Sequence, residues 1–157
     1  MTRSRTVWTA LVGGALALAV TGGAVAQMAK IGSGDPIADR QRLMKLNGAS
    51  WKDVQDKLKA GNAEAVAVNA ETIAMNAQHI TTLFPQGTLS DKSAAKPEIW
   101  QKWSEFESAA KNLETWSVKL RDAARAKDGD QVQAIAKDFG RQACGTCHTP
   151  FRVPPKQ

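Results

Sequence analysis

The sequence predicts an all-α protein that folds as an antiparallel, up-down bundle of four helices. Apolar residues recur at spacings of three and four in four separate segments, which is the period of an amphipathic helix. Glycine, proline, asparagine or aspartate separates each segment from the next, and these residues mark helix ends. No stretch shows the alternation of apolar and polar residues that is typical of strands. Four helices with short turns and one longer connection pack most simply as a bundle.

The first helix is expected to begin after Asp35, which caps it, with Pro36 at the first helical position. Gly61 and Asn62 supply a helix stop and the cap of the next helix. The inward stripe of this helix repeats every seven residues and consists of Ile37, Met44, Trp51 and Leu58.

The second helix is expected from about Ala63 to Phe84, where Pro85 closes it. Residues 85–96 (PQGTLSDKSAAK) are rich in glycine, serine and proline and form the long connection. The third helix is expected to open at Pro97 and to run to Lys127. Asp128 and Gly129 are expected to end this helix.

The fourth helix is expected to be capped by Asp130, with Gln133 completing a capping box. Its inward residues are Val132, Ile135, Phe139, Ala143 and Thr146. Pro150 and the tail after it are expected to end the helix.

The first 26 residues have the pattern of a cleaved signal peptide. Arg3 and Arg5 precede an apolar run over residues 7–20, and the small residues 24–26 (AVA) form a cleavage site. The apolar run is short for a membrane span, although a retained anchor is the alternative. We therefore expect a signal peptide at 1–26, a flexible leader at 27–34, one helical domain at 35–152 and a tail at 153–157. The mature protein is expected in the periplasm.

Near the end of the chain, CGTCH at residues 144–148 has the spacing of a haem c attachment site. On a helix, Cys144 and Cys147 share a face and His148 lies one position further round. The two thiols can then bond the vinyl groups on one edge of a porphyrin while the imidazole binds its iron. We therefore predict one covalent haem c, with His148 as the proximal iron ligand. Export agrees with this, because in bacteria haem c is attached outside the cytoplasm.

Three other interpretations of the two cysteines explain the sequence less well. A zinc site needs about four ligands, and the chain has no other cysteine and only one further histidine, His79. A thioredoxin-like dithiol belongs in a βαβ unit, which the sequence does not predict. A disulfide between Cys144 and Cys147 would close a very short loop and stabilise the fold little.

Charge indicates no nucleic-acid partner. Loss of Arg3 and Arg5 with the signal peptide lowers the net charge from +6 to +4. The lysines are interspersed with acidic residues and form no basic block. No membrane contact is expected after cleavage of the signal. No nucleophile with a base and an orienting partner can be assembled, and no phosphate-binding glycine loop is present, so a carrier is expected and not an enzyme.

Four helices with this attachment motif on the last one resemble the cytochrome c′ family, the class II c-type cytochromes, over nearly the whole mature chain. The match includes Phe151 and Arg152 after the motif, and RQRLMKLNG at residues 40–48 is similar to the first helix of the family. KPEIW at residues 96–100 looks like the members with a low-spin haem. The resemblance implies that Arg152 tunes the iron from the His148 side, although a solvated terminal charge explains Arg152 as well.

The residue opposite His148 decides the function, and Met44 is the predicted distal iron ligand. A thioether is a soft ligand that suits haem iron. Gly48, one turn later, would let a porphyrin approach the helix, and Arg40, one turn earlier, would pair with a propionate. Met28 and Met75 are weaker candidates for the ligand, and His79 lies just off the inward stripe. Alternatively, Met44 only packs over an open site, as a methionine on a helix commonly does.

Two functions follow from these alternatives. With Met44 on the iron, the protein is a low-spin one-electron carrier for periplasmic redox partners. With an open site, it is a five-coordinate cytochrome c′ that binds nitric oxide or carbon monoxide for scavenging or sensing. Two copies pairing into a homodimer through the first two helices would be a further partner arrangement.

Overall fold

Four helical arms carry the apolar stripes, and a computed structural model describes them over residues 32–154. The first arm is α2 (Pro36–Lys59), and the second joins the 3-10 turn η1 (Glu64–Val66), α3 (Ala67–Gln78) and the 3-10 turn η2 (Thr81–Leu83). The third consists of α4 (Glu98–Gln101) and α5 (Trp103–Arg125). The fourth joins α6 (Gly129–Phe139), the π-helical turn η3 (Gly140–Gly145) and α7 (Thr146–Phe151). The predicted signal peptide and residues 27–31 and 155–157 lie outside the described residues.

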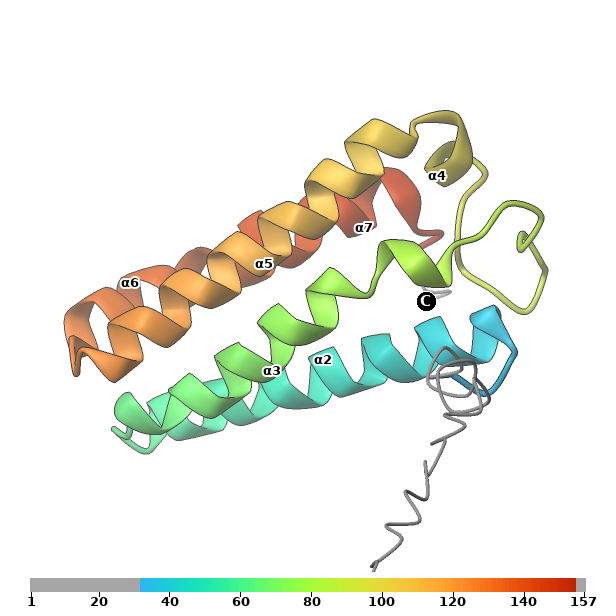
Figure 1. Cartoon of the computed structure of the whole chain (residues 1–157). Coiled ribbons are helices and arrows are strands. Elements are labelled where there is room, and N and C mark those ends of the chain that lie inside the picture. Colours follow the sequence, from blue (N-terminus) through green and yellow to red (C-terminus); the bar gives the residue numbers. More distant parts are fainter. Residues whose placement is uncertain (1–31, 155–157) are drawn as a thin grey trace, which may run out of the picture. The chain divides into compact units, whose positions relative to one another are not determined.

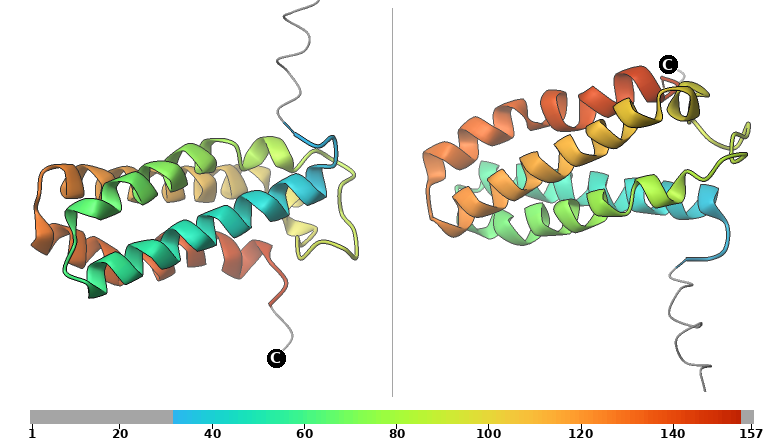
Figure 2. Two further views of the ribbon diagram at one scale, coloured as in Figure 1. Left: turned by 90° about the horizontal axis from the view of Figure 1, so that it is seen from below. Right: turned by 45° about the horizontal axis from the view of Figure 1, so that its top comes forward.

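The arms pack as an antiparallel bundle, which confirms the predicted fold class. In Figures 1 and 2, α2 lies beside α3, and α5 lies beside the arm formed by α6 and α7. The closest helix pairing is between α3 and α5, and α2 with α3 and α5 with α6 also pack closely. Backbone contact between α2 and α7 is at most marginal. The described residues contain no helix long and apolar enough to span a bilayer.

The predicted boundaries of α2 are confirmed. The Asp35 carboxylate accepts hydrogen bonds from the backbone amides of Ile37 and Ala38, and Pro36 is at the first helical position. Gly61 has φ +74°, a left-handed conformation that glycine adopts without steric cost. The side-chain oxygen of Asn62 then accepts from the amide of Ala65 at 3.3 Å.

The second and third arms are less regular than the sequence predicts. The second arm leaves α geometry after Gln78, where the Thr82 hydroxyl donates to the His79 carbonyl at 2.8 Å and competes with the helical ladder. The third arm breaks at Lys102, whose φ of −122° and ψ of 48° separate α4 from α5. In α4 the Trp100 indole donates to the Phe84 carbonyl at 2.9 Å, which ties this turn to the end of the second arm.

The predicted cap of the fourth arm is wrong by two residues. Lys127 has φ 60° and reverses the chain, so the carboxylate of Asp128, and not that of Asp130, accepts from the amide of Gln131 at 2.9 Å. Asp130 lies in the first turn of α6. Pro150 does not end the arm, because α7 continues to Phe151 and tolerates the proline in its last turns.

Replacing Asp128 with alanine is therefore expected to lower the free energy of unfolding by about 1 kcal/mol, the usual contribution of a capping carboxylate. Asp130→Ala removes only a favourable charge near the helix N-terminus and is expected to cost about 0.3–1 kcal/mol. Urea unfolding of both variants measures the difference. A larger loss in Asp130→Ala would contradict the assigned cap.

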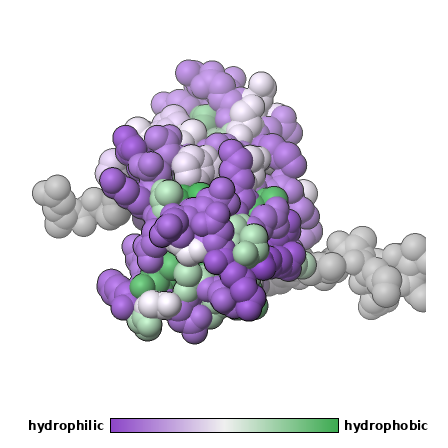
Figure 3. Space-filling model, turned by 90° about the vertical axis from the view of Figure 1, so that its left-hand side faces the viewer, coloured by the Kyte–Doolittle hydropathy of each residue, from purple (hydrophilic) through white to green (hydrophobic). Residues whose placement is uncertain are grey.

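Small side chains form the centre of the core, and aromatic rings form one end. The alanines between α3 and α5 let these helices approach closely; the buried ones include Ala70, Ala74, Ala77, Ala109 and Ala110. Toward the end that holds α4, Phe106 packs edge-on against both Phe84 and Phe151, with ring centroids 4.8 and 5.5 Å apart. These rings join the second, third and fourth arms. Figure 3, which views the opposite end of the bundle, shows a mostly hydrophilic surface with scattered apolar residues.

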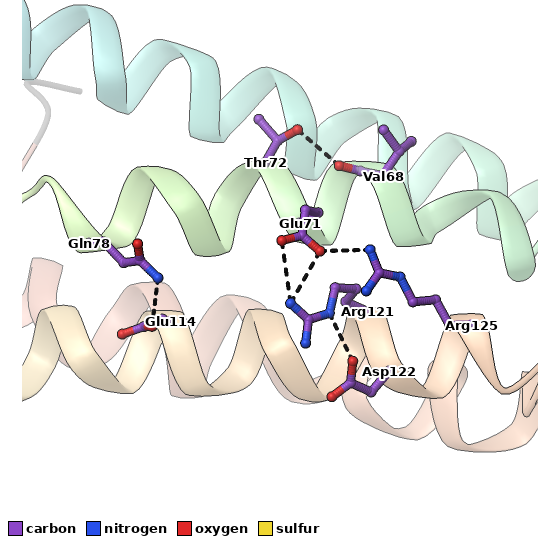
Figure 4. A network of polar contacts seen from close by, with 8 residues as sticks. All are labelled: Val68, Glu71, Thr72, Gln78, Glu114, Arg121, Asp122 and Arg125. Atoms are coloured by element: carbon purple, nitrogen blue, oxygen red, sulfur yellow. Dashed lines mark hydrogen bonds and ion pairs between the residues drawn. The ribbon is translucent and has the colours of Figure 1, made fainter. Parts of the chain in front are cut away.

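Polar contacts tie α3 to α5 on the surface (Figure 4). The Glu71 carboxylate accepts from the guanidinium groups of Arg121 at 3.2 Å and Arg125 at 2.9 Å. The side-chain amide of Gln78 donates to Glu114 at 3.0 Å. The same acidic side chain of Glu114 also binds Lys111.

Glu71→Gln should lower the free energy of unfolding by no more than about 1 kcal/mol, because partly exposed ion pairs contribute little. The loss should shrink as salt rises, since screening already weakens the pair in the parent protein. Thermal unfolding at low and high salt measures it. A salt-independent loss of several kcal/mol would show that Glu71 does more than pair charges.

Candidate haem site

The two cysteines do not lie on one regular α-helix as the spacing predicts. Cys144 falls in the π-helical turn η3, whereas Cys147 and His148 belong to α7. The Gln142 carbonyl accepts from the Thr146 hydroxyl at 2.6 Å and from the Asn112 side-chain amide at 2.6 Å. Both donors are side chains that contact a carbonyl within the π-helical turn, where the regular helical ladder is interrupted. Thr146 was expected to face inward, but it is exposed.

Both thiols are free and half-buried. Burial raises the pKa of Cys144, and burial together with the neighbouring Cys144 raises the pKa of Cys147 to about 11. Burial lowers the pKa of His148, and the nearby Arg152 charge lowers it further. Before haem attachment, these surroundings favour the neutral forms of both thiols and of the imidazole, and the neutral imidazole is the form that binds metals.

Two adjoining cavities lie between α2 and the fourth arm, and we call them together the slot. The outer cavity has about 460 Å³ and the inner one about 120 Å³. Four residues line both of them: Met44 and Gly48 from α2, and Cys147 and His148 from α7. Cys144 lines the inner cavity. The slot therefore brings the predicted distal residue Met44 together with the whole attachment motif.

On the α2 side of the slot, the lack of a side chain at Gly48 leaves room for a flat group to approach the helix closely. Gly48 lines both cavities, and a Cβ atom added there would meet no atom within 4 Å. A side chain at this position would project into the slot. In the inner cavity, Trp51 and Phe139 stack with ring centroids 4.4 Å apart and an interplanar angle of 17°. Trp51 and Phe139 were expected on the inward faces of their helices, and both line the inner cavity.

Arg40 and Arg152 both line the outer cavity, in different environments. Arg40 is 3% exposed, and its guanidinium donates to Thr88 and Ser93 in the connection between the second and third arms. Arg152 is exposed, and the described residues provide no ion pair for it. The predicted pairing of Arg40 with a propionate stays a prediction, since the hydrogen bonds of Arg40 in the structure are to Thr88 and Ser93.

The other candidates lie away from the slot. His79 is exposed at the end of α3, and the Met75 side chain is 56% exposed. Met28 is outside the described residues. Of the methionines that the structure describes, only Met44 lines the slot.

Several residues of the slot were missed by the sequence analysis. Gln41 and Lys45 line the outer cavity beside Met44, and Asn47 lines the inner one. Residues 93–95 also line the outer cavity, although the sequence marks them only as part of a connection. The sequence offered one signal for the residues on α2: positions 41, 45 and 47 lie within one helical turn of Met44 and could therefore line the same cavity.

The slot fits a haem c. Its thiols and imidazole are the donors that haem c attachment needs, and its walls are mainly apolar and aromatic. Its outer cavity falls in the usual size range of cofactor sites, about 300–1,000 Å³. The charged residues Arg40, Lys45 and Arg152 line this cavity, and no carboxylate of the described part of the chain does. A porphyrin with two propionates at one edge is complementary to that charge distribution.

Comparison with known proteins identifies the family. The profile described as Cytochrome C′ matches residues 35–152. Cytochrome c-556 of Agrobacterium tumefaciens (strain II Chrys) is 32% identical over 120 residues, which are 74% of this chain and 96% of that protein. Cytochrome c-554 of Cereibacter sphaeroides is 34% identical over 73 residues, or 45% of this chain. The chain spans about half the length of the two cytochrome c-554 sequences it matches, 46% and 53%.

Solved structures agree with this assignment. The cytochrome c′ of Rubrivivax gelatinosus is 27% identical with a TM-score of 0.66, and the match covers 76% of this chain and 96% of that one. The cytochrome c′ of Thermochromatium tepidum is 26% identical with a TM-score of 0.70, covering 76% and 95%. The chain therefore belongs to the cytochrome c′ family, and its cofactor is a haem c attached through Cys144 and Cys147.

Proposed function

We propose that this protein is a periplasmic one-electron carrier with a six-coordinate, low-spin haem, in which His148 is the proximal and Met44 the distal iron ligand. The observation that carries the proposal is that Met44 lines both cavities of the slot together with Cys147 and His148. When bound, the haem supplies an iron that gains or loses one electron.

Each of these side chains has a distinct role. Burial and Arg152 lower the pKa of His148, which favours the neutral imidazole, and the iron would bind the nitrogen lone pair of that form. The thioether of Met44 offers a soft sulfur, which raises the reduction potential. Trp51 and Phe139 exclude water from the inner cavity. Arg152 and Lys45 supply positive charge at the outer cavity.

The proposed place and role of the carrier follow from the chain itself. Residues 1–26 carry the features of an export signal, and the periplasm is where redox partner proteins would meet the mature domain. We propose a carrier and not an enzyme, because the described residues that line the slot offer haem-binding groups and no set of nucleophile, base and orienting group. A homodimer remains part of the proposal; one cytochrome c′ of similar fold, with a TM-score of 0.68, shows ligand-controlled dimer dissociation.

A five-coordinate haem that binds diatomic gases is the second candidate function. The observation that favours it is the likeness to a cytochrome c prime mutant from Alcaligenes xylosoxidans solved as a nitric oxide complex, with 26% identity and a TM-score of 0.68. In this function, Met44 would pack beside the iron without binding it.

Optical spectra of the ferric and ferrous protein, with and without carbon monoxide, separate the two functions. The electron carrier should give low-spin spectra in both oxidation states, and carbon monoxide should bind slowly because it must displace Met44. Rapid, tight carbon monoxide binding to a high-spin ferrous protein would reject the carrier. Slow binding with displacement of a protein ligand would reject the gas-binding function.

A further inference from the structure

We propose that Arg40 is a positioning residue: its buried guanidinium anchors residues 85–96, which we call the strap, and the strap holds α2 and α7 together at the outer end of the slot. The strap thereby fixes the separation of Met44 and His148. The consequence for iron ligation rests on the proposed function, whereas the anchoring of the strap does not.

The contacts of Arg40 lie almost entirely within the strap. Its guanidinium donates to the Thr88 hydroxyl at 3.0 Å, the Thr88 carbonyl at 2.7 Å and the Ser93 hydroxyl at 2.7 Å. It also lies 4.7 Å from the ring centroid of Phe84, directly before the strap. A guanidinium that is only 3% exposed is costly unless its donors are satisfied, so the arginine and the strap fix each other.

A second contact from α2 supports the same anchor. The side-chain amide of Gln41 donates to the Lys92 carbonyl at 2.6 Å. Within the strap, the Thr88 hydroxyl donates to the Pro85 carbonyl at 2.7 Å, so the acceptor groups are themselves held in place. Two consecutive residues of α2, Arg40 and Gln41, therefore donate hydrogen bonds to both halves of the strap.

The other end of the strap is bound to the segment that follows the haem motif. The Val153 amide donates to the Ala94 carbonyl at 2.8 Å, and the Lys96 amide donates to the Phe151 carbonyl at 3.0 Å. Ala95 and Arg152 form the antiparallel bridge between these two bonds. The strap thus reaches from α2 to the residues directly after α7.

The residues that contact the strap lie about one helical turn from the two proposed iron ligands. Arg40 precedes Met44 by one helical turn, and Arg152 follows His148 by four residues. Residues 93–95 line the outer cavity between them. Because α2 and α7 have at most marginal backbone contact, the strap is a link between the two walls at this end. At the inner end, the stack of Trp51 on Phe139 links α2 to α6.

Weakening the anchor should therefore loosen the outer end of the slot without disturbing the core. The strap would open more often, and the amides of Lys96 and Val153 would exchange with solvent more rapidly. Met44 would leave the iron more often, so carbon monoxide would enter faster. A direct bond from Arg40 to a propionate would predict a different result, because the acceptors in the strap would then not matter.

The test compares three variants of the haem-loaded protein. Arg40→Lys keeps the charge but loses the forked donor geometry. The double variant Thr88→Val with Ser93→Ala keeps Arg40 and removes two of its three acceptors. Arg42→Gln is the matched control, because Arg42 lies on the same helix, is exposed and, among residues 32–154, pairs only with Asp39. Hydrogen exchange of the Lys96 and Val153 amides and the rate of carbon monoxide binding are measured for each.

Arg40→Lys and the double variant should each accelerate both amide exchange and carbon monoxide binding about tenfold, as expected for the loss of one or two buried hydrogen bonds. Arg42→Gln should leave both unchanged. Unchanged exchange in the double variant would overturn the inference. So would an effect of Arg40→Lys on carbon monoxide binding that the double variant lacks, since Arg40 would then act on the haem directly.

Failure of the proposed function has a different signature. If the parent protein already binds carbon monoxide rapidly in a high-spin state, Met44 does not ligate the iron and the carrier is rejected. Amide exchange then decides the inference alone, because the bonds of Lys96 and Val153 do not involve Met44. Faster exchange in both strap variants would support the anchor, and unchanged exchange would reject it.

Discussion

Replacing Met44 with alanine is expected to turn the ferric protein from low-spin to high-spin and to lower its reduction potential by on the order of 100 mV, within the roughly 0.8 V that axial ligands span. A thioether stabilises the ferrous iron, so its loss favours the ferric state. Met44 is the one methionine among residues 32–154 that lines the slot, so no second thioether is available there. Optical spectra and redox titration measure the change.

Two further variants separate ligation from packing. Met44→Leu keeps most of the side-chain volume and removes the sulfur, so it should show the same spectral change as Met44→Ala with less loss of stability. Met75→Ala removes a methionine that is 56% exposed and should leave the spectrum and the potential unchanged. A Met44→Leu protein with the parent spectrum would show that Met44 only fills space, as in the five-coordinate alternative.

The sequence predicted the fold because its helix signals are local. Asp35 and Pro36 mark the start of α2, and Gly61 with φ +74° follows its end, all within a few residues of the backbone groups they serve. The attachment motif is equally local, since its chemistry depends on residues three and four positions apart. Met44 could be chosen from its place on the stripe of α2, and it does line the slot.

Features that depend on distant contacts could not be predicted. At the π-helical turn η3, the Gln142 carbonyl accepts from the side-chain amide of Asn112, thirty residues away, as well as from the Thr146 hydroxyl. The burial of Arg40 depends on Thr88 and Ser93, 48 and 53 positions along the chain. A composition rich in glycine, serine and proline marks residues 85–96 as a connection, but it does not predict that they contact Arg40 and line the outer cavity.

The residues predicted to face inward on α2 are less buried than helical periodicity suggests. Met44 and Trp51 lie on the predicted inward face, yet they are half-buried, whereas Arg40 and Val54 are fully buried on the same helix. Met44 and Trp51 line the slot, so these two residues of the stripe contact the cavities and not only other side chains. Helical periodicity identifies the face that turns inward; it does not distinguish a wall of a cofactor site from a packed core.

Phe139→Ala is expected to destabilise the haem-loaded protein by about 3–5 kcal/mol, the range for truncating a buried aromatic side chain. Phe139 is 0% exposed, stacks on Trp51 at 4.4 Å and lines the inner cavity beside Cys144. The stack links α2 to α6, so its loss removes a contact between the two walls of the slot as well as apolar burial. Urea unfolding, followed by helical circular dichroism, measures the loss.

Phe139→Leu is the matched variant, because it keeps an apolar side chain but loses the stacked ring. It should cost less than Phe139→Ala, about 1–3 kcal/mol, since a smaller cavity is left and only part of the stacking is replaced. Both variants should also shift the haem spectrum, because Trp51 loses the partner that holds it against the inner cavity. If Phe139→Ala cost less than 1 kcal/mol, the ring would be dispensable, and the two walls of the slot would have to be held together chiefly at the strap.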